Sequence, residues 1–444
     1  MNRSVATRTG PPAARQATLR EHNLALVARA VFEASHPCSR ADIAGARGPT
    51  RATVAPLPDR PAAAGIVAEL PPATPQRAGR PAVPLAPAPR TLVGLGLEVN
   101  VDYLGGRVLD LTGAVVAEQV DPDDLHDSDP TEVLARLGRI AHDLLAQVRA
   151  DGMTVAGARL ALPGLVDPRA GRLEVAPNLG WSHLDPVRLL GLGPDVAVEI
   201  GNEAKLAALA QASHGVVPDD ATGPAPSTYL YVSGDVGIGS AIVVDRRLFH
   251  GRHGWTGEVG HVVVDPHGPR CRCGATGCLE QYAGKDALLR GAGLPVDAAT
   301  GTLVAALDAG EPDALAAVER AGTALGSALA DYVNLVDIDT VLLGGIYPAL
   351  LPYLRPAAEA ELRARVLAAP WTDVVLLPAP PAPTPRSRAA RARCCAASSR
   401  TRAPGSPTTE QAILAGRAGP PRASGDRDEP GPPARRPGRA EPGV

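Results

Sequence analysis

Three of the six cysteines in this 444-residue chain lie within eight residues of one another, shortly after a histidine. The four candidate metal ligands are His261, Cys271, Cys273 and Cys278. Three thiols and one imidazole match the donor set of a closed, four-coordinate structural zinc site. Gly274 and Gly277 allow the backbone to turn tightly enough for the sulfurs to reach one ion. The sequence therefore predicts a zinc loop, and a reduced, metal-free loop is the alternative.

Composition and charge limit what the rest of the chain can be. Hydrophobic residues make up 45% of the sequence, enough for sizeable cores, while 47 Gly and 46 Pro require loops, linkers or tails. Residues 1–90 and 386–444 each hold 12 Arg against five acids, a net +7, which leaves −17 on residues 91–385. A polyanion would therefore meet the ends of the chain. Without a disulfide framework, signal peptide or membrane span, we expect a cytoplasmic protein.

The first 70 residues have the outline of a winged helix-turn-helix. Residues 1–15 are expected to be disordered. The apolar spacing over 16–35 predicts an amphipathic helix, and Ser39 followed by Asp42 is a capping-box pattern that opens a short second helix. We interpret 16–70 as a DNA-binding domain, with a small helical docking domain as the alternative.

A third helix in this domain would lie in the major groove of DNA. Thr50 can cap it, and Arg51 and Thr53 are the side chains that we expect to reach the bases. Prolines at positions 56, 58 and 61 each remove a helix hydrogen bond, so the helix is expected to keep only about one turn. Direct reading of bases is therefore predicted to be poor.

A proline-rich segment follows this domain. Residues 71–90 contain seven prolines and are predicted to be a linker. The apolar stretches 66–70 and 83–85 are candidate strands of the wing. Arg80 in this linker is expected to enter a narrow, A·T-rich minor groove.

Strand and helix patterns alternate over residues 91–378 and predict a two-lobed α/β body. Apolar runs at 92–101 and 107–111 flank Gly105-Gly106, which predicts a β-hairpin with its turn there. Further strands are expected at 114–118, 158–162, 196–200, 229–232, 240–244 and 340–343, and helices at 131–149, 203–214 and 314–335. We place lobe 1 at 91–200 and lobe 2, with the zinc loop, at 201–378. Residues 379–444 are predicted to be a disordered basic tail, with a nucleic-acid arm as the alternative.

The zinc loop and its flanks resemble the signature of the ROK family, named for repressors, open reading frames and sugar kinases. Gly257-Glu258-Val259-Gly260-His261 precedes the cysteines, and Leu279-Glu280 follows them. The resemblance extends more loosely over residues 15–378 and implies a two-lobed, actin-like ATPase fold with a sugar bound in the cleft. Family members with an N-terminal winged helix are typically transcriptional regulators, and those without it are typically kinases.

The resemblance also implies roles for individual residues. The positions that match the family's sugar-binding set are Asn202, Glu203, Glu258, His261 and Glu280. Glu203 stands where the kinases carry their catalytic Asp, and its extra methylene displaces the carboxylate. In the first phosphate loop Gly96 replaces an Asp and Glu98 replaces a glycine, and in the second loop Asp235 adds another carboxylate. These departures imply that phosphoryl transfer is lost and that no ATP is bound.

The sequence thus predicts a sugar-responsive repressor without catalytic residues. Its expected cofactor is structural zinc, and its expected partners are a DNA operator and a sugar or sugar-phosphate effector. We expect a homodimer or homotetramer that does not bind membranes. Two alternatives remain: an ATP-dependent sugar kinase, favoured by the fold and the sugar residues, and a degenerate copy with neither activity, favoured by the prolines in the third helix and by the tail.

Overall fold

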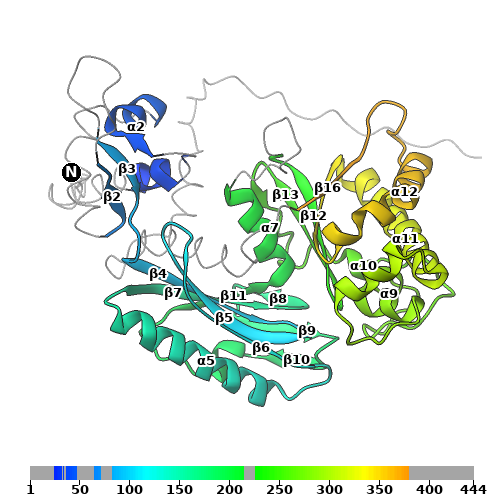
Figure 1. The fold of residues 1–444 in the computed structure, drawn as a ribbon, viewed down its shortest axis with the longest axis horizontal. Helices are drawn as coiled ribbons and strands as arrows, with labels where there is room; N and C mark the ends of the chain where they lie inside the picture. Colours follow the sequence, from blue (N-terminus) through cyan, green and yellow to red (C-terminus); the bar gives the residue numbers. More distant parts are fainter. Residues whose placement is uncertain are drawn as a thin grey trace, which may run out of the picture. The chain divides into compact units, whose positions relative to one another are not determined.

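A computed structural model gives the fold of the chain (Figure 1) and describes residues 25–32, 34, 37–47, 65–71, 83–214 and 226–379. Several expectations fall outside these residues. They are the disordered N-terminal segment, the third helix with Thr50, Arg51 and Thr53, Arg80 with most of the linker, and the basic tail beyond residue 379.

A small N-terminal sheet has the order β1-β3-β2 and is antiparallel throughout. Its elements are β1 (Cys38–Ser39), β2 (Val67–Glu69) and β3 (Pro84–Pro87), with α2 (Arg40–Arg47) directly after β1. Residues 25–32 are helical, as the apolar spacing predicts. The capping box is present, because the Ser39 amide donates to Asp42 Oδ2 at 2.8 Å and the Asp42 amide donates to Ser39 Oγ at 3.2 Å.

β3 confirms the candidate wing strand at 83–85, and because it lies inside the segment 71–90 that we predicted to be a linker, the linker prediction is corrected at its C-terminal end. The prolines occupy the two ends of this four-residue strand. Leu85 between them is fully buried in the core of the small domain. Backbone bonds from Leu70 N to Pro84 O and from Ala88 N to Ile66 O extend the pairing beyond β2. Proline carbonyls can still accept hydrogen bonds, which is why the strand tolerates both prolines.

Lobe 1 is built on a five-stranded sheet of order β11-β7-β4-β5-β6. Its strands are β4 (Leu92–Val99), β5 (Tyr103–Asp110), β6 (Val115–Pro122), β7 (Thr154–Leu162) and β11 (Val198–Asn202). β4, β5 and β6 form an antiparallel meander, whereas β7 and β11 are parallel neighbours. Helix α5 (Pro130–Ala150) covers one face, capped by Asp129, which accepts from Thr131 N and Glu132 N (Figure 1).

The first hairpin turns at a different place from the one we predicted. Gly105 and Gly106 lie inside β5, and the turn falls at Asn100 to Asp102, where the Asn100 side chain accepts from Asp102 N at 3.2 Å. A Cβ at Gly106 would lie 2.8 Å from Leu144 Cδ1 on α5, so a larger residue there would have to displace the end of that leucine side chain. Gly106 therefore marks a close approach of helix and sheet.

A second, smaller sheet follows β7 and was not predicted. It has the order β10-β9-β8, with β8 (Leu165–Asp167), β9 (Arg172–Ala176) and β10 (Trp181–Leu184). The short helix α6 (Pro186–Leu190) then leads back to β11. β11 runs to Asn202, two residues past the predicted end of lobe 1.

Lobe 2 contains a five-stranded sheet of order β14-β13-β12-β15-β16. Its strands are β12 (Tyr229–Gly234), β13 (Ile238–Val244), β14 (Arg247–Leu248), β15 (Thr340–Gly345) and β16 (Val375–Pro378). Alternate residues of β12 enter different cores: Leu230 packs with the helices that follow the zinc loop, and Tyr231 packs with α7 (Glu203–His214). The sheet is therefore covered on both faces, as Figure 1 shows.

The helices on the far face from α7 complete lobe 2. They are α8 (Glu280–Ala283), α9 (Lys285–Gly291), α10 (Thr300–Asp308), α11 (Pro312–Val336) and α12 (Tyr347–Arg365). Among the described residues, no helix has both the length and the apolar character that crossing a bilayer requires.

Candidate functional site

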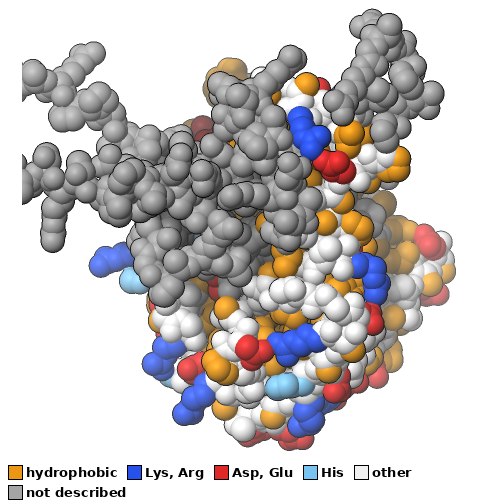
Figure 2. Space-filling view, turned by 90° about the vertical axis from the view of Figure 1, so that its left-hand side faces the viewer, with side chains coloured by type: hydrophobic (Ala, Val, Ile, Leu, Met, Phe, Trp, Pro, Cys, Tyr) orange, Lys and Arg blue, Asp and Glu red, His pale blue; other side chains and the backbone are white. Residues whose placement is uncertain are grey.

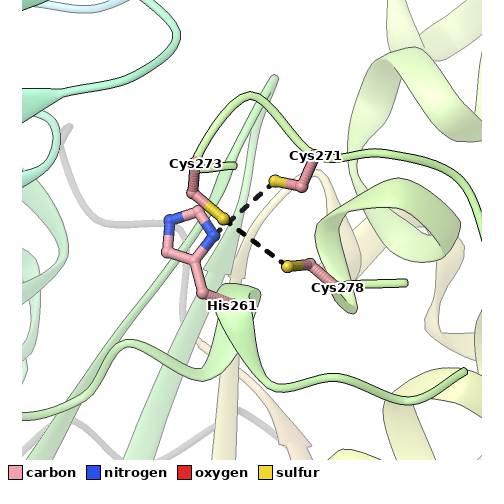
Figure 3. Close-up of side chains that lie close together, drawn as sticks. All are labelled: His261, Cys271, Cys273 and Cys278. Atoms are coloured by element: carbon pink, nitrogen blue, oxygen red, sulfur yellow. Dashed lines mark hydrogen bonds between the residues drawn. The ribbon is translucent and has the colours of Figure 1, made fainter. Parts of the chain in front are cut away.

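The four candidate metal ligands come together around the loop that follows β14. His261 ends the short helix η1 (Val259–His261), and the three cysteines lie on the segment after it (Figure 3). One ligand atom from each residue lies within 4.8 Å of the others. Isolated bridges pair Val263 with Cys278 and Arg270 with Thr276, which folds the loop back on itself.

The spacing of these atoms fits a zinc ion. Cys271 Sγ lies 3.8 Å from His261 Nδ1, and Cys273 Sγ lies 3.7 Å from Cys278 Sγ. A tetrahedral ion with Zn–S bonds of about 2.3 Å holds its sulfurs about 3.8 Å apart. Burial raises the pKa of Cys278 to about 12 and also raises the pKa of Cys271, so a cation is needed to hold both as thiolates at neutral pH.

Two glycines give the loop its shape, as their positions in the sequence suggested. Gly274 and Gly277 have φ values of +97° and +74°, which side-chain-bearing residues rarely adopt. A Cβ at Gly277 would lie 1.5 Å from the carbonyl oxygen of Asp265. Position 277 therefore admits only glycine.

Glu280 connects the zinc loop to the sheet of lobe 2. It begins α8 directly after Cys278-Leu279, and its side chain is buried. Its Oε2 accepts from Ile238 N at 3.2 Å, and its Oε1 lies 3.9 Å from Cys271 Sγ. Burial raises the pKa of this carboxyl, while His261 and a hydrogen bond from Asn178 act in the opposite direction.

Glu258 has a partner that we did not anticipate. The ammonium of Lys205, on α7, lies 3.6 Å from Glu258 Oε1 and donates to the Gly254 carbonyl at 2.7 Å. Burial raises the pKa of Glu258, and the Lys205 charge lowers it. Lys205 therefore supports both the carboxylate and the loop that carries it.

Asn202 and Glu203 stand at the junction of β11 and α7. Asn202 Oδ1 accepts from Lys205 N at 3.1 Å, and Nδ2 donates to the Gly164 carbonyl at 3.0 Å, so the amide caps α7. Glu203 Oε2 is buried and has no hydrogen-bond partner. Burial raises the pKa of Glu203 well above its ordinary value, and the charges of Asp235 and Glu98 raise it further. An orphaned buried carboxyl oxygen is suited to receive a hydroxyl from a ligand.

Carboxyl side chains lie at both segments for which the family resemblance implies phosphate loops. Glu98 accepts from Tyr103 Oη at 2.6 Å at the end of β4. Asp235 lies in the turn between β12 and β13, and burial, followed by the charges of Glu98 and Asp102, raises its pKa to about 7. The Asn100 side chain hydrogen-bonds to Asp235, so the turn of lobe 1 touches the turn of lobe 2.

Lys205 and Lys285 are the functional candidates that sequence reasoning missed, although the sequence held a signal for them. The chain contains 42 Arg and only these two Lys. Both are paired with carboxylates, and their side chains are only 9% and 13% exposed. At both places a compact ammonium contacts a carboxylate where little space is exposed, and a planar guanidinium has a different shape and donor geometry.

The residues proposed for DNA contact cannot be placed, because Thr50, Arg51, Thr53 and Arg80 lie outside the described residues. Of the 12 Arg side chains in residues 1–90, the structure describes those of Arg29, Arg40 and Arg90. On the face drawn in Figure 2, basic and acidic side chains of the described residues are interspersed.

Comparison with known proteins places this geometry in context. The chain is 27% identical over 285 residues to the xylose repressor of Bacillus subtilis, covering 64% of this chain and 72% of the repressor. It is 28% identical over 307 residues to the transcriptional dual regulator NagC of Escherichia coli, covering 67% and 74%. Matches to two other xylose repressors span about half of those proteins, 49% and 47%.

Solved structures share the fold. A ROK family transcriptional regulator, described as a homologue of the E. coli MLC protein, superposes with a TM-score of 0.67 at 26% identity, covering 85% of this chain and 97% of that one. A ROK family glucokinase from Streptomyces griseus has a TM-score of 0.56 at 22% identity, covering 67% and 98%. These neighbours confirm the two-lobed α/β fold. Residues 95–383, well over half of the chain, match the ROK family, and the chain belongs to that family.

Proposed function

We propose that this protein is a sugar-responsive transcriptional repressor whose body binds a sugar without phosphorylating it. The observation that carries the proposal is that Glu203 Oε2 is buried without a hydrogen-bond partner. Burial, followed by the charges of neighbouring carboxylates that include Glu258 and Glu280, raises the pKa of the Glu203 carboxyl group. Sugar hydroxyls could donate to these carboxylates and relieve the unmade hydrogen bond. The relatives named as repressors support the regulatory role.

A structural zinc ion would hold this site together. His261, Cys271, Cys273 and Cys278 would be its ligands, and a closed set of four leaves no position for a reacting water. With Nδ1 of His261 directed at the sulfurs, its Nε2 remains to donate to a sugar hydroxyl. The loop also fixes Glu280, so zinc would orient two members of the sugar-binding set.

The absence of kinase activity belongs to the same proposal. Glu98 at the end of β4 and Asp235 in the turn after β12 place two carboxyl groups where nucleotide phosphates would have to bind, and carboxylates repel phosphates where solvent screens poorly. Glu203 would act as a hydrogen-bond acceptor for the sugar and not as a catalytic base.

DNA binding would be carried by the N-terminal domain. The capped helix α2 and the antiparallel pair β2 and β3 suit a winged helix-turn-helix in which Arg51 and Thr53 contact bases and Arg80 enters the minor groove. A homodimer or homotetramer in the cytoplasm would present two such domains to an operator. A sugar with different affinities for the DNA-bound and free arrangements would then release the operator.

The test is a titration of full-length protein with DNA from the region upstream of its own gene, followed by fluorescence anisotropy. D-Xylose, D-glucose, N-acetyl-D-glucosamine and their phosphates are then added, and a coupled assay records any ADP. We expect one sugar to release DNA from the native protein, and Glu203→Gln to keep DNA binding while responding less. Sugar-dependent ADP production would establish the kinase instead. If neither DNA binding nor ADP is detected, the protein is a copy without either activity.

A further inference from the structure

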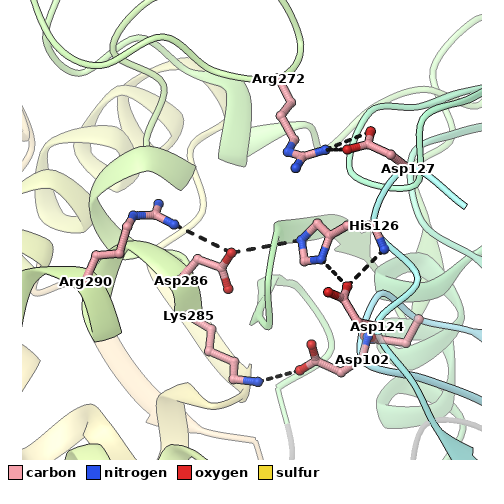
Figure 4. Close-up of polar contacts among 9 residues, drawn as sticks. Asp102, Asp124, His126, Asp127, Arg272, Lys285, Asp286 and Arg290 are labelled. Carbon is pink, nitrogen blue, oxygen red and sulfur yellow. Dashed lines mark hydrogen bonds and ion pairs between the residues drawn. The ribbon is translucent and has the colours of Figure 1, made fainter. Parts of the chain in front are cut away.

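The two lobes are joined by direct ionic contacts across the cleft (Figure 4). Lys285 Nζ, at the start of α9 in lobe 2, lies 2.5 Å from Asp102 Oδ2, just before the hairpin strand β5 in lobe 1. Arg272, between two zinc ligands, donates through Nη1 to both carboxylate oxygens of Asp127 at 2.9 Å. His126 Nε2 lies 3.9 Å from Asp286.

The Lys285–Asp102 pair is better shielded than the Arg272–Asp127 pair. The side chains of Lys285 and Asp102 are 13% and 40% exposed, against 43% and 68% for Arg272 and Asp127. Exposed ion pairs contribute little because water and salt screen them, whereas a partly buried pair retains more of its attraction. The Lys285 contact should therefore hold the lobes more strongly than the Arg272 contact.

Lys285 also organises the turn that faces lobe 1. Its backbone amide donates to the Asp235 carbonyl at 2.8 Å, and its charge lowers the pKa of the Asp235 carboxyl. Asp235 in turn receives the Asn100 side chain from lobe 1. One residue thus binds two points of the cleft, five positions after Glu280 of the candidate sugar site.

We propose that Lys285 is a positioning residue that holds the cleft in its sugar-binding arrangement without any nucleotide. The proposal rests on the function proposed above. The bridge between lobes is a side-chain ammonium, so the cleft needs no bound phosphate or metal ion between its two turns. Loss of the bridge lowers the fraction of molecules in which both lobes present their groups together, and the apparent sugar affinity falls by that fraction.

An ionic bridge gives this site an unusual property. A neutral sugar makes no ion pair, so its affinity should not depend on salt. If Lys285–Asp102 sets the competent fraction, high salt weakens the bridge and with it the binding of an uncharged sugar. A residue with a merely structural role does not create such a dependence.

The experiment uses full-length native protein, Lys285→Met, Asp102→Asn, their double variant and the control Arg363→Met. Arg363 lies on α12 of lobe 2, and its guanidinium is 3.5 Å from Glu359 on the same helix, so the control removes an ion pair within one lobe. Hydrogen exchange is followed in peptides containing residues 100–104 and 233–239. The affinity for D-xylose, D-glucose and N-acetyl-D-glucosamine is measured at low NaCl and at about 1 M, where the screening length is about 3 Å.

We expect faster exchange in both peptides for Lys285→Met and Asp102→Asn, with the double variant no worse than either and Arg363→Met unchanged. Sugar affinity should fall about 3- to 10-fold in the same variants, and its salt dependence should be smaller than in the native protein. Unchanged exchange in 100–104 of Lys285→Met, or equal salt dependence in that variant and the native protein, would overturn the proposal. If native protein binds none of the sugars, the proposed function fails, while hydrogen exchange still decides whether Lys285 bridges the lobes.

Discussion

Replacing Asp235 by an asparagine should stabilise the protein, and increasingly so as the pH rises. Burial raises the pKa of Asp235 from 3.8 to about 7, with added repulsion from Glu98 and Asp102. A carboxyl group whose pKa is higher in the folded state stabilises that state fully only at pH values below its unfolded pKa. This stabilisation decreases as the pH rises from the unfolded pKa to about 7, and above that pH the folding free energy no longer depends on this group.

The size of the effect follows from the shift. About 3 pKa units at about 1.4 kcal/mol each amount to at most about 4 kcal/mol of folding free energy, of which about 2 kcal/mol is lost between pH 5 and pH 7. The side-chain amide in Asp235→Asn cannot ionise, so the variant does not lose this contribution. The stability of Asp235→Asn relative to the native protein should therefore increase by about 2 to 3 kcal/mol from pH 5 to pH 8.

Urea denaturation of full-length protein at pH 5, 6, 7 and 8 and constant ionic strength measures this difference. Asp297→Asn is the matched control, because Asp297 is exposed and lies outside the cleft. Its stability relative to the native protein should not change with pH. Parallel curves for Asp235→Asn and the native protein would mean that the carboxyl is hydrated in the folded state, and the argument from burial would be wrong.

Three further outcomes are expected. Metal analysis of purified native protein should give about one zinc per chain. Cys273→Ser should lose the metal together with thermal stability, since three ligands no longer close the site. A native protein that contains no metal and melts at the same temperature as the variant would contradict this. Glu203→Asp should not restore ATP-dependent sugar phosphorylation in a coupled assay, because Glu98 at the end of β4 and Asp235 in the turn after β12 remain close to position 203. Lys205→Met should weaken sugar binding about 10-fold, measured by calorimetry, because Glu258 and the Gly254 carbonyl lose a buried partner. Lys205→Arg should also bind sugar weakly, because the bulkier guanidinium does not fit in the place of the ammonium.

Local sequence patterns predicted most of the helices and strands. The helix expected at 203–214 has those bounds, and the helix expected at 131–149 extends by one residue at each end. Both follow a residue that caps the helix, Asn202 and Asp129, and the helix at 131–149 also has apolar spacing, so neighbouring residues decide much of both. The metal-ligand set was equally visible, because its four members lie within 18 residues of one another.

Contacts between distant segments could not be predicted in this way. Lys285 and Asp102 are 183 positions apart, and their meeting depends on how two sheets are connected. The hairpin turn was misplaced because Gly105-Gly106 has the composition of a turn, although both glycines lie inside β5 and Gly106 lies where α5 approaches that strand. Composition alone cannot separate these two uses of glycine.

Helix α12 shows how far packing can override a local rule. Pro352 and Pro356 both lie inside it and are both exposed, four residues apart on one face. The hydrogen bonds that they remove are therefore on the solvent side, where water can satisfy the free carbonyls, while Leu350 and Leu354 are fully buried. Proline spacing relative to the buried face, and not proline number, decides whether such a helix survives.

The scarcity of lysine gives this protein a built-in chemical reporter. An amine-reactive reagent finds only two side-chain targets in the whole sequence, and each is engaged in a shielded ion pair in the folded chain. Acylation of Lys285 requires its ammonium to leave Asp102, and acylation of Lys205 requires it to leave Glu258. Mass spectrometry of the arginine-cleaved peptides measures the acylation rate of each lysine separately. The rate at Lys285 thus reports how often the lobes separate, and the rate at Lys205 reports how often the loop that carries Glu258 opens.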